Sequence, residues 1–242
     1  MFRHQGKSRT LKHNLQIASL LSFVAGIVNV SGFLAVQRLT TNITGHFAFF
    51  VDEVFKLNFL KSFIYFIYIF CFFLGSFTSS FLIEYMTKKR HHVHVSYLVP
   101  VVFESMILLF VSLFGSNLMS YNPEILVFLL LFSMGLQNSL VTKISNATVR
   151  TTHLTGLFTD LGIELSQMIF YKQKEQQNVL ISTIKLRLTI ISFFFFGGLL
   201  SGILYSKIKL YTLTLAASLL FIGAIYDDVK FKILQQARKH QK

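Results

Sequence analysis

The stretch Thr40-Thr41-Asn42-Ile43-Thr44-Gly45 is a polar motif between long apolar segments, and it recurs 111 positions later as Thr151-Thr152-His153-Leu154-Thr155-Gly156. A glutamate follows each copy, Glu53 in the first case and Glu164 in the second. A polar motif that is repeated between apolar segments is typical of transporters that build a binding site near the middle of the bilayer. We call these stretches the first motif and the second motif.

The composition excludes an ordinary soluble domain. Hydrophobic residues make up 53% of the chain, 28 residues are Phe, and the mean hydropathy is +0.59. Crossing a hydrocarbon core of about 30 Å takes about 20 apolar residues. Six segments are predicted to cross: 15–36, 62–83, 95–115, 124–142, 188–206 and 208–226. The first is too long for the apolar part of a signal peptide, which predicts a retained span behind a basic N-terminus, 1–14.

The net charge of +13 is concentrated at the ends of these segments. Basic clusters lie at Lys88-Lys89-Arg90, at Lys172 and Lys174, and in the tail 227–242. This pattern is typical of a cytoplasmic face that contacts anionic lipid headgroups, and it argues against nucleic-acid binding. The positive-inside rule is satisfied best, with most basic loops in the cytoplasm, when the short segments after the motifs, 43–58 and 154–171, do not cross the membrane. Six crossings with both termini in the cytoplasm are then predicted.

The repeat extends beyond the motifs. Residues 15–115 and 124–226 each contain a span, a motif with its short segment, and two more spans. Three crossings per unit is an odd number, so the two units have opposite orientations in the membrane. The sequence therefore predicts an all-α integral membrane protein built from two inverted three-span repeats. The short segments could still be short spans, surface helices or re-entrant segments.

The two units also match outside the motifs. Gly26 and Asn29 correspond to Gly135 and Asn138 at an offset of 109 positions. The stretch Phe73-Leu74-Gly75-Ser76 aligns loosely beside Phe196-Gly197-Gly198-Leu199.

The candidate binding residues are polar groups inside apolar helices. Thr hydroxyls and backbone groups freed at a broken helix could bind an ion or a small polar substrate, but they could equally form a tight helix joint. The predicted substrate-binding residues are Asn29, Thr44, Gly45, Gln137, Asn138, Thr151, Thr152, Thr155, Gly156 and Asp160.

Acidic residues in apolar surroundings form a second candidate group. Glu53 and Glu164 are equivalent in the two units, which makes them candidates for carrying a proton or a cation. Alternatively, they reach the membrane surface or pair with neighbours such as Lys56 and Arg150. Glu104 lies in the middle of the third predicted span.

Catalytic and metal-binding signatures are not found in the sequence. The chain has no Gly-x-Ser-x-Gly, no His-Glu-x-x-His and no phosphate-binding Gly-rich loop, so we expect neither an enzyme nor a cofactor. His91, His92 and His94 lie in a strongly basic loop without Cys or acidic companions, so no metal site is predicted there.

Several of these residues resemble a known family. Gly26-x-x-Asn29, Thr44-Gly45-His46, the stretch 134–141 and the stretch 149–162 are similar to the YoaK-like family of bacterial multi-pass membrane proteins (domain of unknown function 1275). The resemblance covers residues 15–226. It implies an inner-membrane location and about six spans, but no substrate or reaction.

The chain departs from the family in the first unit. The family usually has Asp at the position of Asn29, and Thr-Gly-Asn where this chain has Thr44-Gly45-His46. The second motif is therefore the better preserved candidate site.

Together these observations predict a small transporter or permease-like protein whose two motifs meet around an unknown small ligand. Its small size favours a homodimer. The alternative is a membrane protein that scaffolds or regulates a partner and transports nothing.

Overall fold

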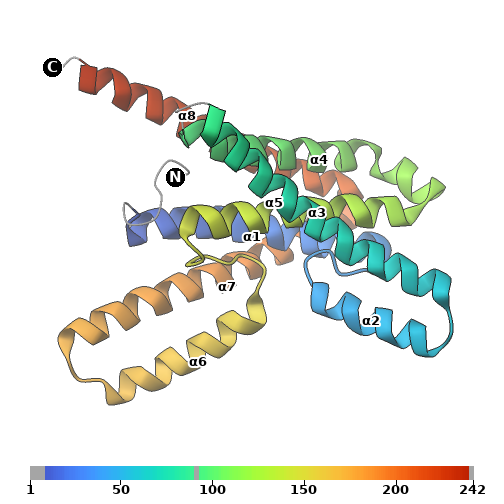
Figure 1. Ribbon diagram of the computed structural model, residues 1–242, viewed down its shortest axis with the longest axis horizontal. Coiled ribbons are helices and arrows are strands. Elements are labelled where there is room, and N and C mark those ends of the chain that lie inside the picture. Colours follow the sequence, from blue (N-terminus) through green and yellow to red (C-terminus); the bar gives the residue numbers. More distant parts are fainter. Residues whose placement is uncertain (1–8, 90–92, 240–242) are drawn as a thin grey trace.

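The regular structure of the protein is helical throughout the described residues, 9–89 and 93–239 of a computed structural model (Figure 1). In chain order the helices are α1 (Leu11–Val36), α2 (Ile43–Phe55), α3 (Phe59–Lys89), α4 (Val93–Tyr121), α5 (Pro123–Ser145), α6 (Leu154–Phe170), α7 (Lys174–Ile208), the short 3-10 helix η2 (Lys209–Thr212) and α8 (Leu213–Lys239). The predicted basic N-terminus, the basic loop with His91 and His92, and the basic tail lie partly outside these residues, at 1–8, 90–92 and 240–242.

Among the described residues, five helical segments are long and apolar enough to cross a membrane. They are Leu11–Val36, Phe59–Lys89, Val95–Tyr121, Pro123–Ser145 and Lys174–Ile233. The last of these is 60 residues long and contains α7, η2 and most of α8. Helix α7 begins at Lys174, well before the predicted position 188, because its polar first turns pack along α6 and hydropathy alone does not detect them.

Helices α1 and α7 pack in direct backbone contact. A Cβ atom on Gly26 would collide with the carbonyl oxygen of Phe194, and a Cβ atom on Gly197 would collide with that of Phe23. Small residues at a helix crossing let two backbones approach closely, which maximises packing where water supplies no driving force. The crossing therefore depends on both glycines.

Helices α3 and α5 form a second crossing of the same kind. A Cβ atom on Gly75 would collide with the carbonyl oxygen of Phe132, and one on Gly135 would collide with that of Phe72. The Ser76 hydroxyl also donates a hydrogen bond of 3.1 Å to the Gly135 carbonyl oxygen. Each crossing thus pairs two helices that are far apart in sequence.

Helices α4 and α8 complete the bundle and share polar contacts within its interior. The Ser105 hydroxyl donates to the Ala217 carbonyl oxygen at 2.8 Å, and the hydroxyls of Ser112 and Thr214 lie 2.6 Å apart. The main apolar core is formed by buried side chains of α1, α4, α5, α7 and α8.

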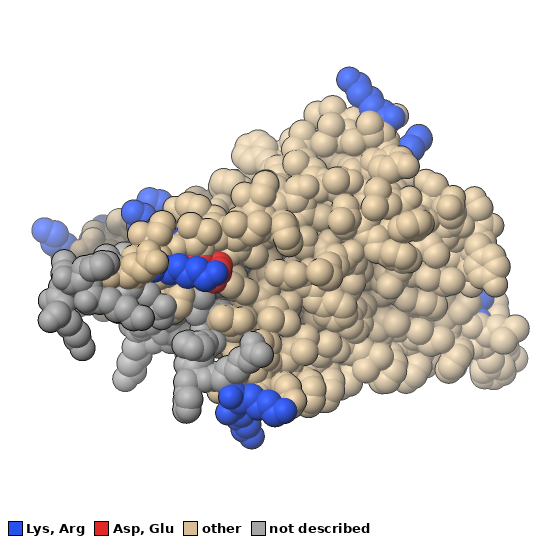
Figure 2. Space-filling view, turned by 90° about the horizontal axis from the view of Figure 1, so that it is seen from above, with Lys and Arg blue, Asp and Glu red and all other residues tan. Residues whose placement is uncertain are grey.

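The outer surface is unusually apolar. Along α3, seven rings at Phe63, Phe66, Phe70, Phe73, Phe77, Phe81 and Tyr85 stack in sequence, with successive centroids 6.0–6.4 Å apart. Each ring is 45–61% exposed. Figure 2 shows Lys and Arg mostly toward the edges of one face, with a broad uncharged area between them. Such a surface is suited to lipid, and the apolar helices are consistent with a multi-pass membrane protein.

Helices α2 and α6 lie on the same side of this bundle. Each begins close to the middle of the molecule and runs outward, α2 beside α3 and α6 beside α7, toward opposite ends (Figure 1). The two motifs are the segments that lead into these helices. The fold therefore brings the motifs to the centre.

Candidate functional site

The two motifs line one cavity of about 940 Å³. The first motif supplies Thr41–Gly45 and the second supplies Thr152–Thr155. The packed helices contribute matching residues from each half of the chain: Asn29 and Asn138, Phe72 and Phe194. The cavity therefore lies between polar motif segments and helices that meet at the glycine crossings.

Each motif is fastened to the helix before it by the same hydrogen bond. The Thr41 hydroxyl donates to Oδ1 of Asn29 at 2.8 Å, and the Thr152 hydroxyl donates to Oδ1 of Asn138 at 2.8 Å. All four side chains are partly buried and line the cavity. The second Thr of each motif thus fixes the position of the loop and the orientation of an amide in the cavity.

The first Thr of each motif is fully buried behind this layer. Thr40 donates to the Val28 carbonyl oxygen at 3.3 Å. In the other half, Nε2 of the fully buried Gln137 donates to the Thr151 hydroxyl and to the Leu21 carbonyl oxygen, each at 3.0 Å. The buried hydroxyls and the Gln137 Nε2 have partners, which makes their burial tolerable, whereas Oε1 of Gln137 is buried without a partner among the described residues. Gln137 and Thr151 therefore support the cavity from outside its lining.

The matched bonds allow a test of this anchoring. Thr152→Val keeps the side-chain shape but removes the donor to Asn138, so we expect the free energy of unfolding to fall by about 1 kcal/mol. Thr159→Val is the control, because that exposed hydroxyl bonds only the Thr155 carbonyl oxygen of its own helix at 3.0 Å. Thermal unfolding of the purified variants measures the difference. If Thr152→Val and Thr159→Val lost the same free energy of unfolding, the Thr152–Asn138 hydrogen bond would not anchor the second motif.

The N-terminal ends of α2 and α6 both face the cavity. At α2 the N-cap side chain of Asn42 accepts a hydrogen bond of 3.0 Å from the Gly45 backbone N–H. At α6 the N-cap residue is His153, and its side chain makes no capping bond. A Cβ atom on Gly156 would collide with the His153 ring, so this glycine lets the imidazole fold over the first turn of α6. Helix N-termini carry free N–H groups and partial positive charge.

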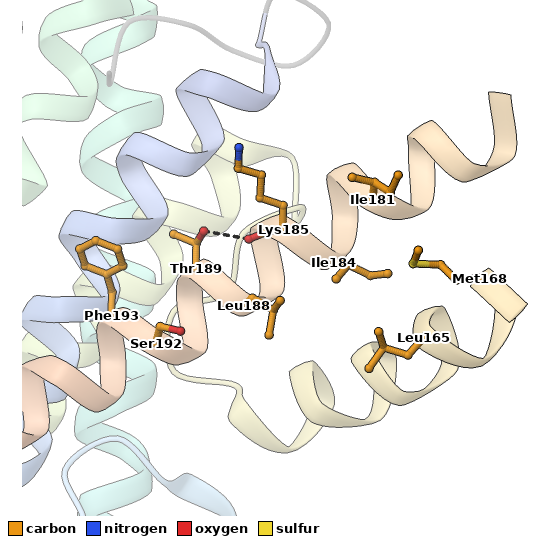
Figure 3. Close-up of a pocket in the computed structure, with 9 residues that line it drawn as sticks. All are labelled: Leu165, Met168, Ile181, Ile184, Lys185, Leu188, Thr189, Ser192 and Phe193. Atoms are coloured by element: carbon orange, nitrogen blue, oxygen red, sulfur yellow. Dashed lines mark hydrogen bonds between the residues drawn. The ribbon is translucent and has the colours of Figure 1, made fainter. Parts of the chain in front are cut away.

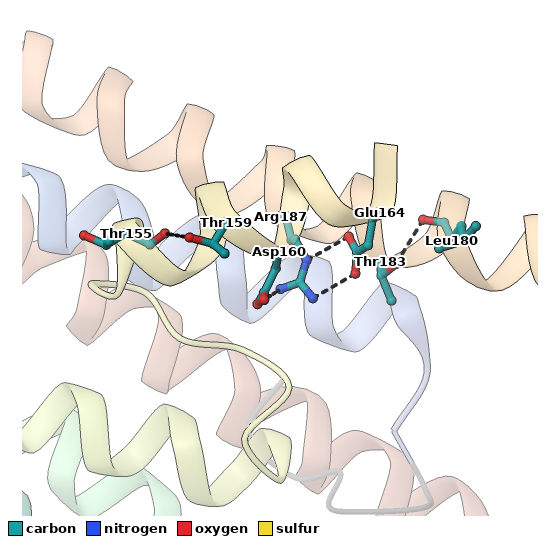
Figure 4. Close-up of polar contacts among 7 residues, drawn as sticks. All are labelled: Thr155, Thr159, Asp160, Glu164, Leu180, Thr183 and Arg187. Carbon is teal, nitrogen blue, oxygen red and sulfur yellow. Dashed lines mark hydrogen bonds and ion pairs between the residues drawn. The ribbon is translucent and has the colours of Figure 1, made fainter. Parts of the chain in front are cut away.

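The acidic candidates of the second half are paired rather than free. Arg187 on α7 binds Glu164 through two hydrogen bonds of 2.8 Å and reaches Asp160 at 3.0 Å (Figure 4). The two acidic residues lie one turn apart on α6, so one guanidinium serves both. This ion-paired cluster joins α6 to α7.

The equivalent acid of the first half has different surroundings. Glu53 is partly buried on α2 and does not line the cavity. The neighbouring Asp52 forms an ion pair with Lys56, which ends α2. The hydrogen bond and the charge of Asp52 raise the pKa of the Lys56 ammonium above its ordinary value. The predicted equivalence of Glu53 and Glu164 therefore does not extend to their contacts.

The predicted substrate-binding residues are distributed over three positions. Six of them line the central cavity: Asn29, Thr44, Gly45, Asn138, Thr152 and Thr155. Gly156 and Asp160 line a smaller adjacent cavity of about 270 Å³, which shares Arg150 and His153 with the central one. Gln137 and Thr151 are buried behind the lining.

Sequence reasoning did not select Thr41, Arg150, Phe72 or Phe194, which also line the cavity. Thr41 could have been found as the equivalent of Thr152 at the motif offset. Arg150 was considered only as a partner for the acids. The two Phe residues carry no local signal, because 28 Phe residues occur in the chain.

Another cavity, of about 630 Å³, lies between α6 and α7 (Figure 3). It is lined mainly by apolar side chains, among them Leu165, Met168, Ile181 and Leu188. Leu165, Ile181 and Leu188 are 47–49% exposed on the outer surface. A mainly apolar groove on the outer surface offers few partners to a polar ligand, so it is a poorer candidate for a polar binding site.

Glu104, in the middle of α4, is the most isolated acid. It is fully buried, and neither carboxylate oxygen has a hydrogen-bond partner among the described residues. It lies outside all the cavities described above. Within residues 9–89 and 93–239, no group of three or more His, Cys, Asp or Glu residues could hold a metal ion.

The fold and the cavity define a class, that of all-helical proteins with several helices able to cross a membrane. The chain belongs to the family described as "Protein of unknown function (DUF1275)", whose profile matches residues 17–226. Comparison with curated proteins and with solved structures gives no match.

Proposed function

We propose that the protein is a transporter of a small molecule or ion, with its binding site in the central cavity between the two motifs. One observation carries the proposal. Two segments that are 111 residues apart line the same cavity and are fastened by the same Thr–Asn hydrogen bond, from Thr41 to Asn29 and from Thr152 to Asn138. A polar site at the junction of two repeats is the arrangement found in many transporters.

The proposal includes two inverted repeats, and the glycine crossings support them. Gly26 and Phe23 of α1 correspond to Gly135 and Phe132 of α5, both at an offset of 109. Likewise, Phe72 and Gly75 of α3 correspond to Phe194 and Gly197 of α7, at an offset of 122. The α1–α7 contact therefore repeats the α5–α3 contact residue by residue. Each half supplies the first helix of one crossing and the third helix of the other.

The proposed topology has six crossings, by α1, α3, α4, α5, α7 and α8. A straight helix over the 60 residues of Lys174–Ile233 would be about 90 Å long, three times the hydrocarbon thickness. The chain instead turns at η2, where Lys209 has a φ of 52°. The basic segment ends then lie beside anionic lipid at the cytoplasmic face, so in the proposed topology both termini lie on the cytoplasmic side of a bacterial inner membrane.

Helices α2 and α6 are too short to cross in this topology. Their 13 and 17 residues correspond to about 20 and 26 Å, less than the hydrocarbon thickness of about 30 Å. Each begins beside the cavity and runs to one membrane surface: α2 runs to the outer surface and α6 to the cytoplasmic surface. Non-helical backbone at membrane depth is tolerated where it lines a polar cavity. The cavity accordingly lies near the bilayer midplane.

Cysteine accessibility tests this proposal without knowledge of the substrate. In a Cys71→Ser background, Thr44→Cys and Thr155→Cys place single thiols in the cavity. We expect a small, hydrophilic, membrane-impermeant thiol reagent to modify both thiols from each side of the membrane, because a transporter exposes its site alternately. Labelling in right-side-out and inside-out vesicles measures this reaction.

Three control variants calibrate the labelling. Lys56→Cys should react only from outside and Lys172→Cys only from inside, while Phe77→Cys on the lipid-facing aromatic row should not react. Cavity thiols that react from neither side would overturn the transport proposal and favour a scaffold or regulatory protein with a dry motif junction. Reaction of Lys56→Cys from inside would overturn the six-crossing topology.

A further inference from the structure

We propose that the ligand of the central cavity is a small organic monocarboxylate, whose carboxylate binds Arg150 and whose apolar body lies between Phe72 and Phe194. This inference rests on the proposed transport function and adds the chemical class of the substrate. It follows from the charges and surfaces of the cavity wall.

Arg150 is the first of these features. It is exposed, lines both the central cavity and the adjacent smaller one, and lies directly before the second motif. No ion pair or hydrogen bond joins its guanidinium to any residue within 9–89 and 93–239. An exposed guanidinium at a cavity wall is open to an anionic ligand, and its planar fork matches the geometry of a carboxylate.

No nearby acid among the described residues forms an ion pair with Arg150, although Asp160 lines the smaller cavity with it. None of the residues that line the central cavity is Asp or Glu. Asp160 and Glu164 are held by Arg187, and Asp52 is held by Lys56. The cavity wall therefore has one full positive charge, which one anionic group of the ligand would neutralise.

The remaining polar groups of the wall favour the same charge. The N-terminal ends of α2 and α6 add partial positive charge, as described above. The hydroxyls of Thr44 and Thr155 can donate to an oxygen of the ligand, whereas a cation would find only amide and hydroxyl acceptors beside a guanidinium.

The apolar part of the wall selects an organic anion. Phe72 and Phe194 line the cavity at corresponding places in the two halves, and Ile43 and Leu154 add aliphatic surface. A hydrated inorganic anion gains nothing from such surface, whereas burial of an apolar body is favourable. A volume of about 940 Å³ accommodates a small aromatic or aliphatic acid together with water.

Benzoate and two analogues of similar shape test the inference: benzamide, which is uncharged, and benzylamine, which is a cation. We expect benzoate to raise the Tm of the purified protein and to be taken up by proteoliposomes, while benzamide and benzylamine do neither. Arg150→Gln should weaken benzoate binding 10- to 100-fold, the loss of one charge-assisted contact. Arg150→Lys should retain part of the affinity, because the charge remains and only the bidentate geometry is lost.

Other outcomes would separate this inference from the proposed function. Stabilisation by benzamide or benzylamine equal to that by benzoate would overturn the carboxylate assignment, while reactive cavity thiols would leave transport intact. If chloride or inorganic phosphate raised the Tm as much as benzoate does, the assignment of an organic rather than an inorganic anion would be overturned. If the Arg150→Gln variant has the wild-type Tm and binds benzoate with the wild-type affinity, the assignment of the carboxylate to Arg150 would also be overturned. Cavity thiols that react from neither side would instead remove the transport function itself.

Discussion

Gly135→Ala is expected to destabilise the protein by about 3 kcal/mol or more, and Gly26→Ala by a similar amount. The new Cβ atom collides with the carbonyl oxygen of Phe72 in the first variant and of Phe194 in the second. Overpacking a core usually costs about 1–3 kcal/mol because side chains can adjust. Here the obstacle is backbone, so the helices themselves must separate. Thermal unfolding in detergent and the yield of monodisperse protein measure the loss.

The chain supplies matched controls for this experiment. A Cβ atom on Gly162 or Gly202 meets nothing within 4 Å, and both glycines lie inside helices. We expect Gly162→Ala and Gly202→Ala to be neutral or to stabilise by up to about 1 kcal/mol, since Ala favours helix more than Gly does. If Gly135→Ala behaves like these controls, the backbone contact at the crossing is not as close as described.

Arg187→Gln is expected to have the second largest effect, a loss of roughly 2 kcal/mol in the free energy of unfolding. The substitution leaves Glu164 without its partner, and the Glu164 side chain is only 11% exposed. Removing one member of a buried pair can cost about 3–5 kcal/mol, and we lower this value because Arg187 is 22% exposed. Chemical or thermal unfolding of the purified variant measures the loss.

A double variant separates the pair from the individual side chains. Glu164→Gln combined with Arg187→Gln removes both charges, so it should recover much of the stability lost in Arg187→Gln alone. Asp52→Asn is the surface comparison, because the Asp52–Lys56 pair is more than half exposed on both sides and should contribute little. A double variant as unstable as Arg187→Gln would argue against an energetic role for the pair.

The sequence correctly predicts the helical class and the presence of helices long and apolar enough to cross a membrane, because length and hydropathy determine both. It also predicts family membership, since the motifs are specific. Two details required the structure. Helix α7 starts at Lys174 because contacts with α6 extend it through polar residues. The loose alignment of Gly75 with Gly198 is also replaced, because the carbonyl contacts match Gly75 to Gly197.

The candidate site could be predicted in part. The repeated motif points to Thr44, Thr155 and the two Asn residues, which the fold brings to one cavity. The partner of Glu164 could not be predicted, since Arg187 follows 23 residues later and on another helix. The position of Arg150 in the cavity wall could not be predicted either, because a basic residue at a segment end is expected from the positive-inside rule alone. Only its position in the cavity wall, with no ion pair to any described residue, distinguishes it.

The glycine crossings also determine which helices surround the cavity. They join α1 to α7 and α5 to α3, and since α6 packs on α7 and α2 on α3, the cavity lies between two groups of helices. The chain passes between these groups in the segments 37–42 and 146–153, where Gln37, Asn146 and Ala147 have positive φ angles. Both motifs therefore connect the two groups of helices as well as lining the cavity. A ligand held in the cavity would contact both of these connecting segments.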